Sequence, residues 1–185
     1  MNIFITNDDG IEAIGIQALA KTMAEFGNIY VVAPDKEYSG MSRSISIRKP
    51  LTAKKYHIAD DIVSYSLAGS PTDCVKVGIE GIFKEVEFDL LLSGINRGPN
   101  LGSDVFYSGT VSAALEGLYQ NIPSIALSNC SFEDDSNAYE LICDKFREFL
   151  NGYLKNMDKQ REFILNINFP EKICVDNEFA VTSLG

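Results

Sequence analysis

The sequence has a single histidine and only four cysteines, and no two cysteines form a CxxC pair. The histidine, His57, lies in a polar stretch away from the motifs described below, so acid–base catalysis by histidine has little support. The cysteines are widely spaced, which argues against a zinc site and against a disulfide framework. We expect them to be small buried hydrophobic residues, and they are Cys74, Cys130, Cys143 and Cys174.

Long hydrophobic runs and a secretory signal are also missing. No apolar run reaches the length of about 18 residues that spans a membrane, so no membrane partner is expected. The N-terminus has no basic segment followed by an apolar one, and we therefore expect a cytoplasmic protein.

Positive charge is scarce, with 16 Lys and Arg against 26 Asp and Glu and a formal net charge of −10. This balance argues against nucleic acid as the main partner. One stretch between Glu37 and Asp60 is nevertheless basic and contains no acid. We interpret it as a solvated hairpin, with steering of an anionic substrate as the alternative. Its basic residues are Arg43, Arg48, Lys49, Lys54 and Lys55.

What the sequence does contain is ordinary for a globular α/β protein. A chain of 185 residues with 45% hydrophobic and 23% charged residues suits one domain with a full core. We therefore expect residues 1–185 to form a single domain.

A short apolar run near the N-terminus leads directly into two adjacent carboxylates. The run, residues 3–5, reads as a buried strand of a parallel sheet, and it is followed by Asp8 and Asp9 just past the predicted strand end. Open α/β sheets bind ligands at this edge, and adjacent carboxylates repel each other unless a cation lies between them. The alternative is a solvated turn closed by Gly10.

Further strands and helices alternate along the chain. Apolar positions at helical spacing over residues 14–26, followed by an apolar run over 29–34, predict a βαβ unit with a right-handed crossover. We expect a hairpin excursion over about residues 43–68, with strands at 45–51 and 62–67, covering the end of the sheet. The other elements are expected as helices at 70–81, from 108 and at 138–154, and as strands at 88–93, 123–128 and 163–169. The pattern predicts a Rossmann-like, three-layer α/β/α fold with a mostly parallel sheet.

Three more polar segments follow predicted strands. Ser39 and Gly40 lie in a loop after the second strand. Asn96 lies in a segment, residues 94–102, that holds three glycines and a proline and is therefore expected to lack regular structure. Ser108 opens a helix whose first N–H groups suit a phosphate. Taken singly, these segments also fit a plain polar connection and an ordinary Ser cap. Placed on one sheet edge with the two aspartates, they predict an all-oxygen site for Mg²⁺, Mn²⁺ or Ca²⁺ beside an anion site.

Four segments, in this order and spacing, resemble the family of the stationary-phase survival protein SurE. The resemblance extends from Met1 to Pro170, nearly the whole chain. It implies a metal-dependent phosphatase that hydrolyses nucleoside 5′-monophosphates, a 5′-nucleotidase, with 3′-nucleotides and short polyphosphate as further substrates of some members. The segments are Asn7-Asp8-Asp9-Gly10, Ala33-Pro34 with Ser39-Gly40, residues 93–100 and residues 107–114.

The resemblance also implies roles for individual residues. One divalent metal ion per subunit, Mg²⁺ or Mn²⁺ with Ca²⁺ also able to occupy the site, is expected on Asp8, Asp9, Ser39 and Asn96. Of these, Asp8, Asp9 and Asn96 are the expected catalytic residues. The phosphate and the rest of the substrate are expected to contact Asn7, Gly40, Ser108, Gly109 and Thr110.

The family's usual C-terminal segment is the one departure. Members usually continue well past residues 182–185, with a segment that takes part in subunit exchange and closes part of the pocket. A homodimer or homotetramer is implied, weakened if that segment is truly absent.

Other classes with an acidic strand end fit less well. Haloacid-dehalogenase phosphatases need Asp-x-Asp after the strand, whereas Asp8 and Asp9 are adjacent. A response-regulator receiver needs an Asp and a Lys where this chain has Asn96 and Ser128-Asn129. A nucleotide-binding protein without catalysis is the remaining alternative.

Overall fold

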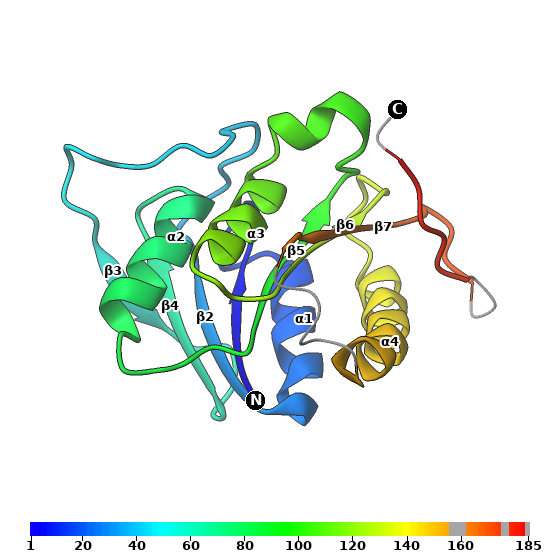
Figure 1. Ribbon diagram of the computed structural model, residues 1–185, viewed down its shortest axis with the longest axis horizontal. Coiled ribbons are helices and arrows are strands. Elements are labelled where there is room, and N and C mark those ends of the chain that lie inside the picture. The colour runs from blue at the N-terminus through cyan, green and yellow to red at the C-terminus, as the bar shows by residue number, and fades with distance from the viewer. Residues whose placement is uncertain (156–161, 175–177, 184–185) are drawn as a thin grey trace.

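The computed structural model describes residues 1–155, 162–174 and 178–183, which form a seven-stranded sheet in the order β3-β4-β2-β1-β5-β6-β7 (Figure 1). All neighbouring strands are parallel except β3 and β4. This confirms the predicted Rossmann-like, mostly parallel sheet. The strands are β1 Asn2–Thr6, β2 Asn28–Pro34, β3 Ala53–Tyr56, β4 Ile62–Leu67, β5 Leu90–Arg97, β6 Ser124–Asn129 and β7 Leu165–Phe169.

Helices cover both faces of the sheet, which confirms the three layers (Figure 1). One face carries α1 (Ile14–Met23), which continues as the short helix η1 (Ala24–Phe26), and α4 (Ser136–Tyr153). The other face carries the two remaining α-helices with two short helices beside them. These are α2 Pro71–Val77, η2 Gly78–Ile82, η3 Gly102–Phe106 and α3 Gly109–Tyr119.

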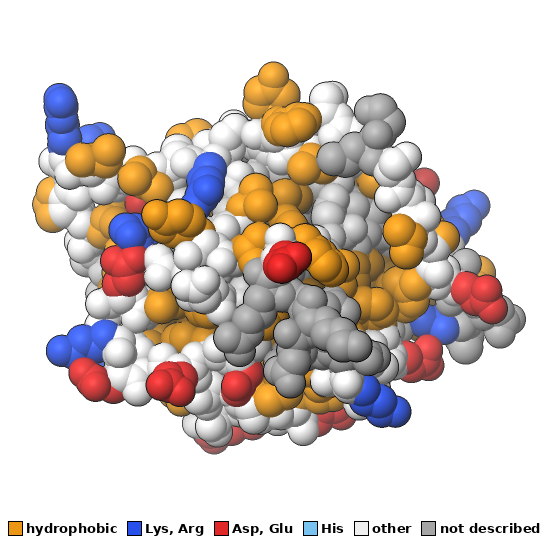
Figure 2. Space-filling model, in the orientation of Figure 1, with side chains coloured by type: hydrophobic (Ala, Val, Ile, Leu, Met, Phe, Trp, Pro, Cys, Tyr) orange, Lys and Arg blue, Asp and Glu red, His pale blue; other side chains and the backbone are white. Residues whose placement is uncertain are grey.

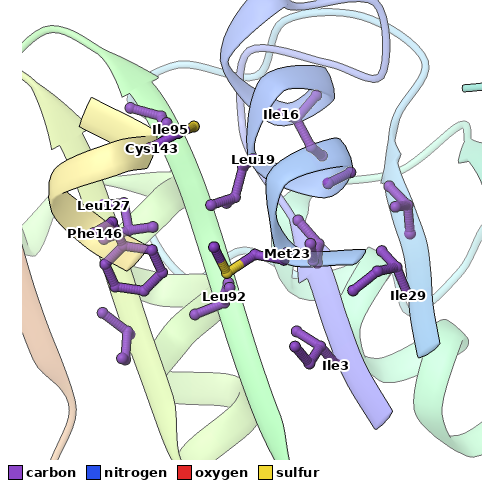
Figure 3. Close-up of a cluster of buried hydrophobic side chains, with 14 of the residues drawn as sticks. Ile3, Ile16, Leu19, Met23, Ile29, Leu92, Ile95, Leu127, Cys143 and Phe146 are labelled. Atoms are coloured by element: carbon purple, nitrogen blue, oxygen red, sulfur yellow. The ribbon is translucent and has the colours of Figure 1, made fainter. Parts of the chain in front are cut away.

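The central strands β1, β2, β5 and β6 are mostly buried and largely apolar because both faces of the sheet are covered there. Alternate residues of β1 point to opposite sides: Ile3 and Ile5 pack beneath α1 and α4, and Phe4 packs toward α2. Figure 3 shows the first of these cores, where Leu19 and Phe146 come from the two helices. Burial of each such side chain contributes about 2 kcal/mol.

The first strand of the hairpin was predicted at the wrong place. Residues 45–51 form no strand; the backbone N–H and the hydroxyl of Ser46 bond to the carboxylate of Asp73, each at 2.8 Å, instead of to a neighbouring strand. Asp73 belongs to the capping box of α2, so a tertiary contact overrides the alternating pattern. The hairpin itself is confirmed, as β3 and β4. It extends the sheet beside β2 rather than covering the sheet end.

Strand β5 is longer than predicted. It runs through Gly94 to Arg97, with a register shift against β6 between Ser93 and Asn96. The expectation that residues 94–102 lack regular structure is therefore wrong for the first four of them, because a bulge lets the strand absorb the glycine and continue. Asn96 therefore lies within the last two residues of β5, where it pairs with Ser128 of β6, rather than beyond the strand.

The cysteines only partly match their predicted burial. Cys74 and Cys143 are buried, Cys130 is partly buried and Cys174 is exposed. No helix in the described part of the chain is long and apolar enough to cross a membrane.

Helix α1 approaches β5 closely because residue 15 has no side chain. A Cβ at Gly15 would lie 2.3 Å from the Ile95 carbonyl oxygen. We expect Gly15→Ala to lower the free energy of unfolding by about 1–3 kcal/mol through overpacking, measured by urea denaturation. Gly152→Ala in α4 is the matched control, because a Cβ there meets nothing within 4 Å. Equal stability of the two variants would contradict the close approach.

Candidate functional site

The carboxyl ends of β1 and β5 mark the point where the strand order of the sheet reverses. From β1 the chain continues to β2 on one side and later crosses to β5 on the other. Open α/β sheets bind ligands in the crevice at this point. Asp8 and Asp9 follow β1, and Asn96 is the second-last residue of β5, so the predicted residues meet there.

A tight turn holds the two aspartates. The amide of Asn7 donates to the Gly10 carbonyl oxygen at 2.8 Å and accepts from the Gly10 N–H at 3.2 Å. Asn7 is fully buried, and Gly10 has φ +101°, which favours glycine. The structure thus shows Asn7 as the residue that closes the turn; a contact of Asn7 with phosphate stays a prediction.

Asp8 is seated against the first turn of α3. Its Oδ1 accepts a hydrogen bond from the Thr110 hydroxyl and its Oδ2 one from the Thr110 N–H, the latter at 3.3 Å. A Cβ at Gly109 would lie 2.8 Å from the Asp8 Cβ, so this seat requires glycine. Ser108 caps the helix by accepting from the Val111 N–H at 3.1 Å. A carboxylate therefore already occupies part of the helix start predicted for phosphate.

Burial raises the pKa of both carboxyls. Asp8 is only 4% exposed, and loss of hydration raises its pKa although the hydrogen bonds from Thr110 oppose the rise. Desolvation, followed by the negative charge of Asp8, raises the pKa of Asp9 to about 7. The Arg97 N–H, which donates to Asp9 Oδ2 at 3.0 Å, and the Arg97 charge oppose this second rise. The pair is thus short of positive charge.

Both aspartates line a cavity of about 420 Å³. Its walls also carry four of the other predicted site residues and two further carboxylates, while Arg97 is the one cation among its lining residues. The further carboxylates are those of Glu37 and Asp104. The predicted residues on the walls are Asp8, Asp9, Ser39, Gly40, Asn96 and Ser108. The other three predicted site residues do not line the cavity: Gly109 and Thr110 lie against Asp8, and Asn7 closes the turn that holds it.

The two uncharged residues predicted as metal ligands, Asn96 and Ser39, each have a side-chain oxygen that can still accept an interaction. The Asn96 amide group donates to the Gly98 carbonyl oxygen at 2.8 Å, and no hydrogen bond among the described residues engages its Oδ1. The Ser39 hydroxyl donates to the Glu37 carboxylate at 2.7 Å, which leaves the lone pairs of its oxygen as acceptors.

Sequence reasoning missed the charge network around Arg97. The guanidinium lies 3.7 Å from Glu37 and 3.2 Å from Asp134, so it links loops that follow β2 and β6. Arg97 and Asp9 also line a second cavity of about 150 Å³, beside α1 and Asp134. Arg97 sat inside a recognised motif, but nothing in the sequence paired it with these acids.

The donor set suits a hard divalent cation. In residues 1–155, 162–174 and 178–183, no group of three or more His, Cys, Asp or Glu side chains is placed to hold a metal. A cation here would therefore need the oxygens of Ser39 and Asn96 together with those of Asp8 and Asp9. Such a cation would compensate the negative charge of the two aspartates, whose pKa values are raised because they have lost hydration.

Comparison with known proteins identifies the family of the chain. Residues 3–185 match the family model of the survival protein SurE. The chain is 48% identical over 171 residues to the 5′-nucleotidase SurE of Kosmotoga olearia, a match that covers 92% of this chain and 66% of that protein. For the 5′-nucleotidase SurE of Clostridium botulinum (strain 657 / Type Ba4), the identity is 39% and the match covers 96% of this chain and 69% of that protein.

A solved structure is similar over the same extent. The SurE protein from Aquifex aeolicus matches with a TM-score of 0.81 at 37% identity, over 93% of this chain and 67% of that chain. This chain spans about two thirds of the length of the relatives it matches. With a family model that matches nearly all of its residues and relatives of this similarity, the chain belongs to the SurE family.

Proposed function

We propose that this chain is a metal-dependent phosphatase that hydrolyses nucleoside 5′-monophosphates to nucleoside and phosphate. The observation that carries the proposal is the pair of adjacent carboxylates at the switch point of the sheet, the buried Asp8 and the partly buried Asp9, whose pKa values are both raised. The names of the relatives, 5′-nucleotidase SurE, support the same substrate class.

The proposed holders of the divalent cation, Mg²⁺ or Mn²⁺, are Asp8, Asp9, Ser39 and Asn96. When bound, such an ion supplies Lewis-acid polarisation of a phosphate oxygen and makes water acidic enough to attack near neutral pH. It also explains how a phosphate dianion can enter a cavity whose walls carry four carboxylates.

Residues of the chain itself would orient the reactants. Both oxygens of Asp8 accept bonds from Thr110, which fixes that carboxylate and leaves Asp9 as the better-placed acceptor of a proton from water. The Arg97 guanidinium, which lines the cavity, would counter charge on the phosphate. Asp9 Oδ2 stays aligned by the Arg97 N–H.

Several finer points stay predictions: 3′-nucleotides and short polyphosphate as further substrates, a homodimer or homotetramer, a single-domain chain and residence in the cytoplasm. The phosphate contacts of Asn7, Gly40, Ser108, Gly109 and Thr110 belong with them.

The proposal predicts that the purified 185-residue chain releases phosphate from 5′-AMP and 5′-GMP with Mn²⁺ or Mg²⁺ and stops when EDTA is added. Asp8→Asn and Asp9→Asn each remove a ligand charge, so we expect kcat/KM to fall about 100-fold or more. The exposed Asp61→Asn is the control and keeps the activity. A folded chain that binds metal but releases no phosphate would show a nucleotide-binding protein instead.

A second prediction concerns pH in the absence of metal. The pKa of Asp9 is about 7 in the folded chain and 3.8 in the reference state, so the fold binds the proton more tightly than the unfolded chain. This contribution to stability is complete below pH 3.8 and is lost as pH rises to 7. In EDTA, we expect the free energy of unfolding of the wild type to fall between pH 5 and pH 8. For Asp9→Asn we expect this fall to be smaller, by on the order of 2 kcal/mol.

Urea denaturation at four pH values measures this difference, again with Asp61→Asn as control. Adding Mn²⁺ should reverse the wild-type trend, because metal binding requires ionised carboxylates. Parallel curves for wild type and Asp9→Asn would mean that Asp9 ionises normally and would remove the electrostatic reason for a cation.

A further inference from the structure

An aromatic ring stands in the wall of the acidic cavity. Phe132 lines the same cavity as Asp8 and Asp9, and it is 73% exposed. A single exposed phenylalanine on an open surface needs no explanation, but this ring faces the space beside the proposed reacting groups.

The loop that carries Phe132 is firmly held. A Cβ at Gly98 would lie 2.6 Å from Phe132 Cε1, so the ring packs directly on a glycine of the segment after β5. The Gly98 N–H donates to the Asn129 carbonyl oxygen at 2.8 Å, and the Asn129 side chain accepts from the Ser131 N–H at 3.0 Å. The Ser131 hydroxyl in turn accepts from the Glu133 N–H at 3.1 Å. These contacts present the ring in a fixed place.

The charges of the cavity indicate that the part of a ligand next to Phe132 is uncharged. Four carboxylates and one guanidinium line the walls, so an anionic group is best accommodated at Asp8 and Asp9, where the proposed cation would lie, and near Arg97. A volume of about 420 Å³ exceeds what a phosphate fills and lies in the range of small-molecule sites. An exposed ring offers a flat apolar face, which suits a stacked heterocycle.

We propose that Phe132 is the stacking platform for the nucleobase of the substrate. The inference rests on the proposed function, since it places the base of a nucleoside monophosphate whose phosphate lies at the aspartates. It makes Phe132 a specificity residue: it favours esters that carry a base over sugar phosphates that carry none.

Phe106 provides a matched control. It is 72% exposed, nearly the same as Phe132, but it does not line the cavity. Hydrophobic side chains gather at the top of one face, over the green helical segment between β5 and α3 that ends at Phe106 (Figures 1 and 2). A general effect of removing an exposed ring would affect both positions alike.

The experiment compares hydrolysis of 5′-AMP with that of ribose 5-phosphate, which lacks a base, in Phe132→Ala, Phe132→Tyr and Phe106→Ala. We expect Phe132→Ala to raise KM for 5′-AMP about tenfold with kcat retained, and to leave ribose 5-phosphate unchanged. Phe132→Tyr keeps the ring and the wild-type KM, and Phe106→Ala changes neither substrate. An equal change for both substrates, or no change for 5′-AMP, overturns the proposal.

Adenosine binding in EDTA, measured by calorimetry, separates this inference from the proposed function. We expect wild type to bind adenosine about tenfold more tightly than Phe132→Ala, without metal or phosphate. If wild type releases no phosphate from any ester, the proposed function fails, and adenosine binding still decides the base site. Equal adenosine affinity of wild type and Phe132→Ala overturns the inference. If Phe132→Ala also breaks a homodimer that Phe106→Ala leaves intact, the ring belongs to an interface between two copies of the chain.

Discussion

The contact between Asp8 and the first turn of α3 is the constraint on which the site depends. It joins residues 102 positions apart in the chain, because Thr110 donates two hydrogen bonds to the carboxylate. The start of a helix favours a negative charge, and the absence of a side chain at Gly109 lets the carboxylate approach. Burial nevertheless raises the pKa of Asp8, so the helix compensates only part of the lost hydration.

That incomplete compensation organises the surroundings. The turn that Asn7 closes holds Asp9 beside Asp8. Desolvation, and after it the negative charge of Asp8, raises the pKa of Asp9 to about 7. Arg97 lies close but divides its charge between Glu37 and Asp134. The fold thus keeps Asp8 and Asp9 together, while the nearby guanidinium of Arg97 is shared with two other carboxylates. This arrangement suits a site completed by an external ion.

Much of this architecture could be predicted because the signals are local. The run before Asp8 marks a buried strand, Ser70 with Pro71 marks a helix start, and both patterns are confirmed. The residues at strand ends converge because parallel strands finish at one sheet edge, so their order along the chain sufficed to group them.

The rest depended on contacts between distant segments. The strand expected at 45–51 was wrong because Ser46 bonds to Asp73 of a helix 27 residues away. The glycine-rich residues 94–102 suggested a loop, whereas the first four of them continue β5 past a register shift. Which partner each site residue has, such as Thr110 for Asp8, cannot be read from spacing, because hydrogen bonds form in three dimensions.

The cavity combines two ends with different physical requirements. The end at Asp8 and Asp9 is electronegative, and its affinity for a phosphate must depend on a cation and on ionic strength. The side chain of Phe132 is uncharged and apolar, so the stacking proposed for its ring would depend on neither the cation nor the ionic strength. In the proposed function, the ring would favour a substrate that carries a base, and the carboxylates would accept a phosphate only together with a metal ion. Under the proposed function, this division explains how a chain with a net charge of −10 would accept an anionic substrate.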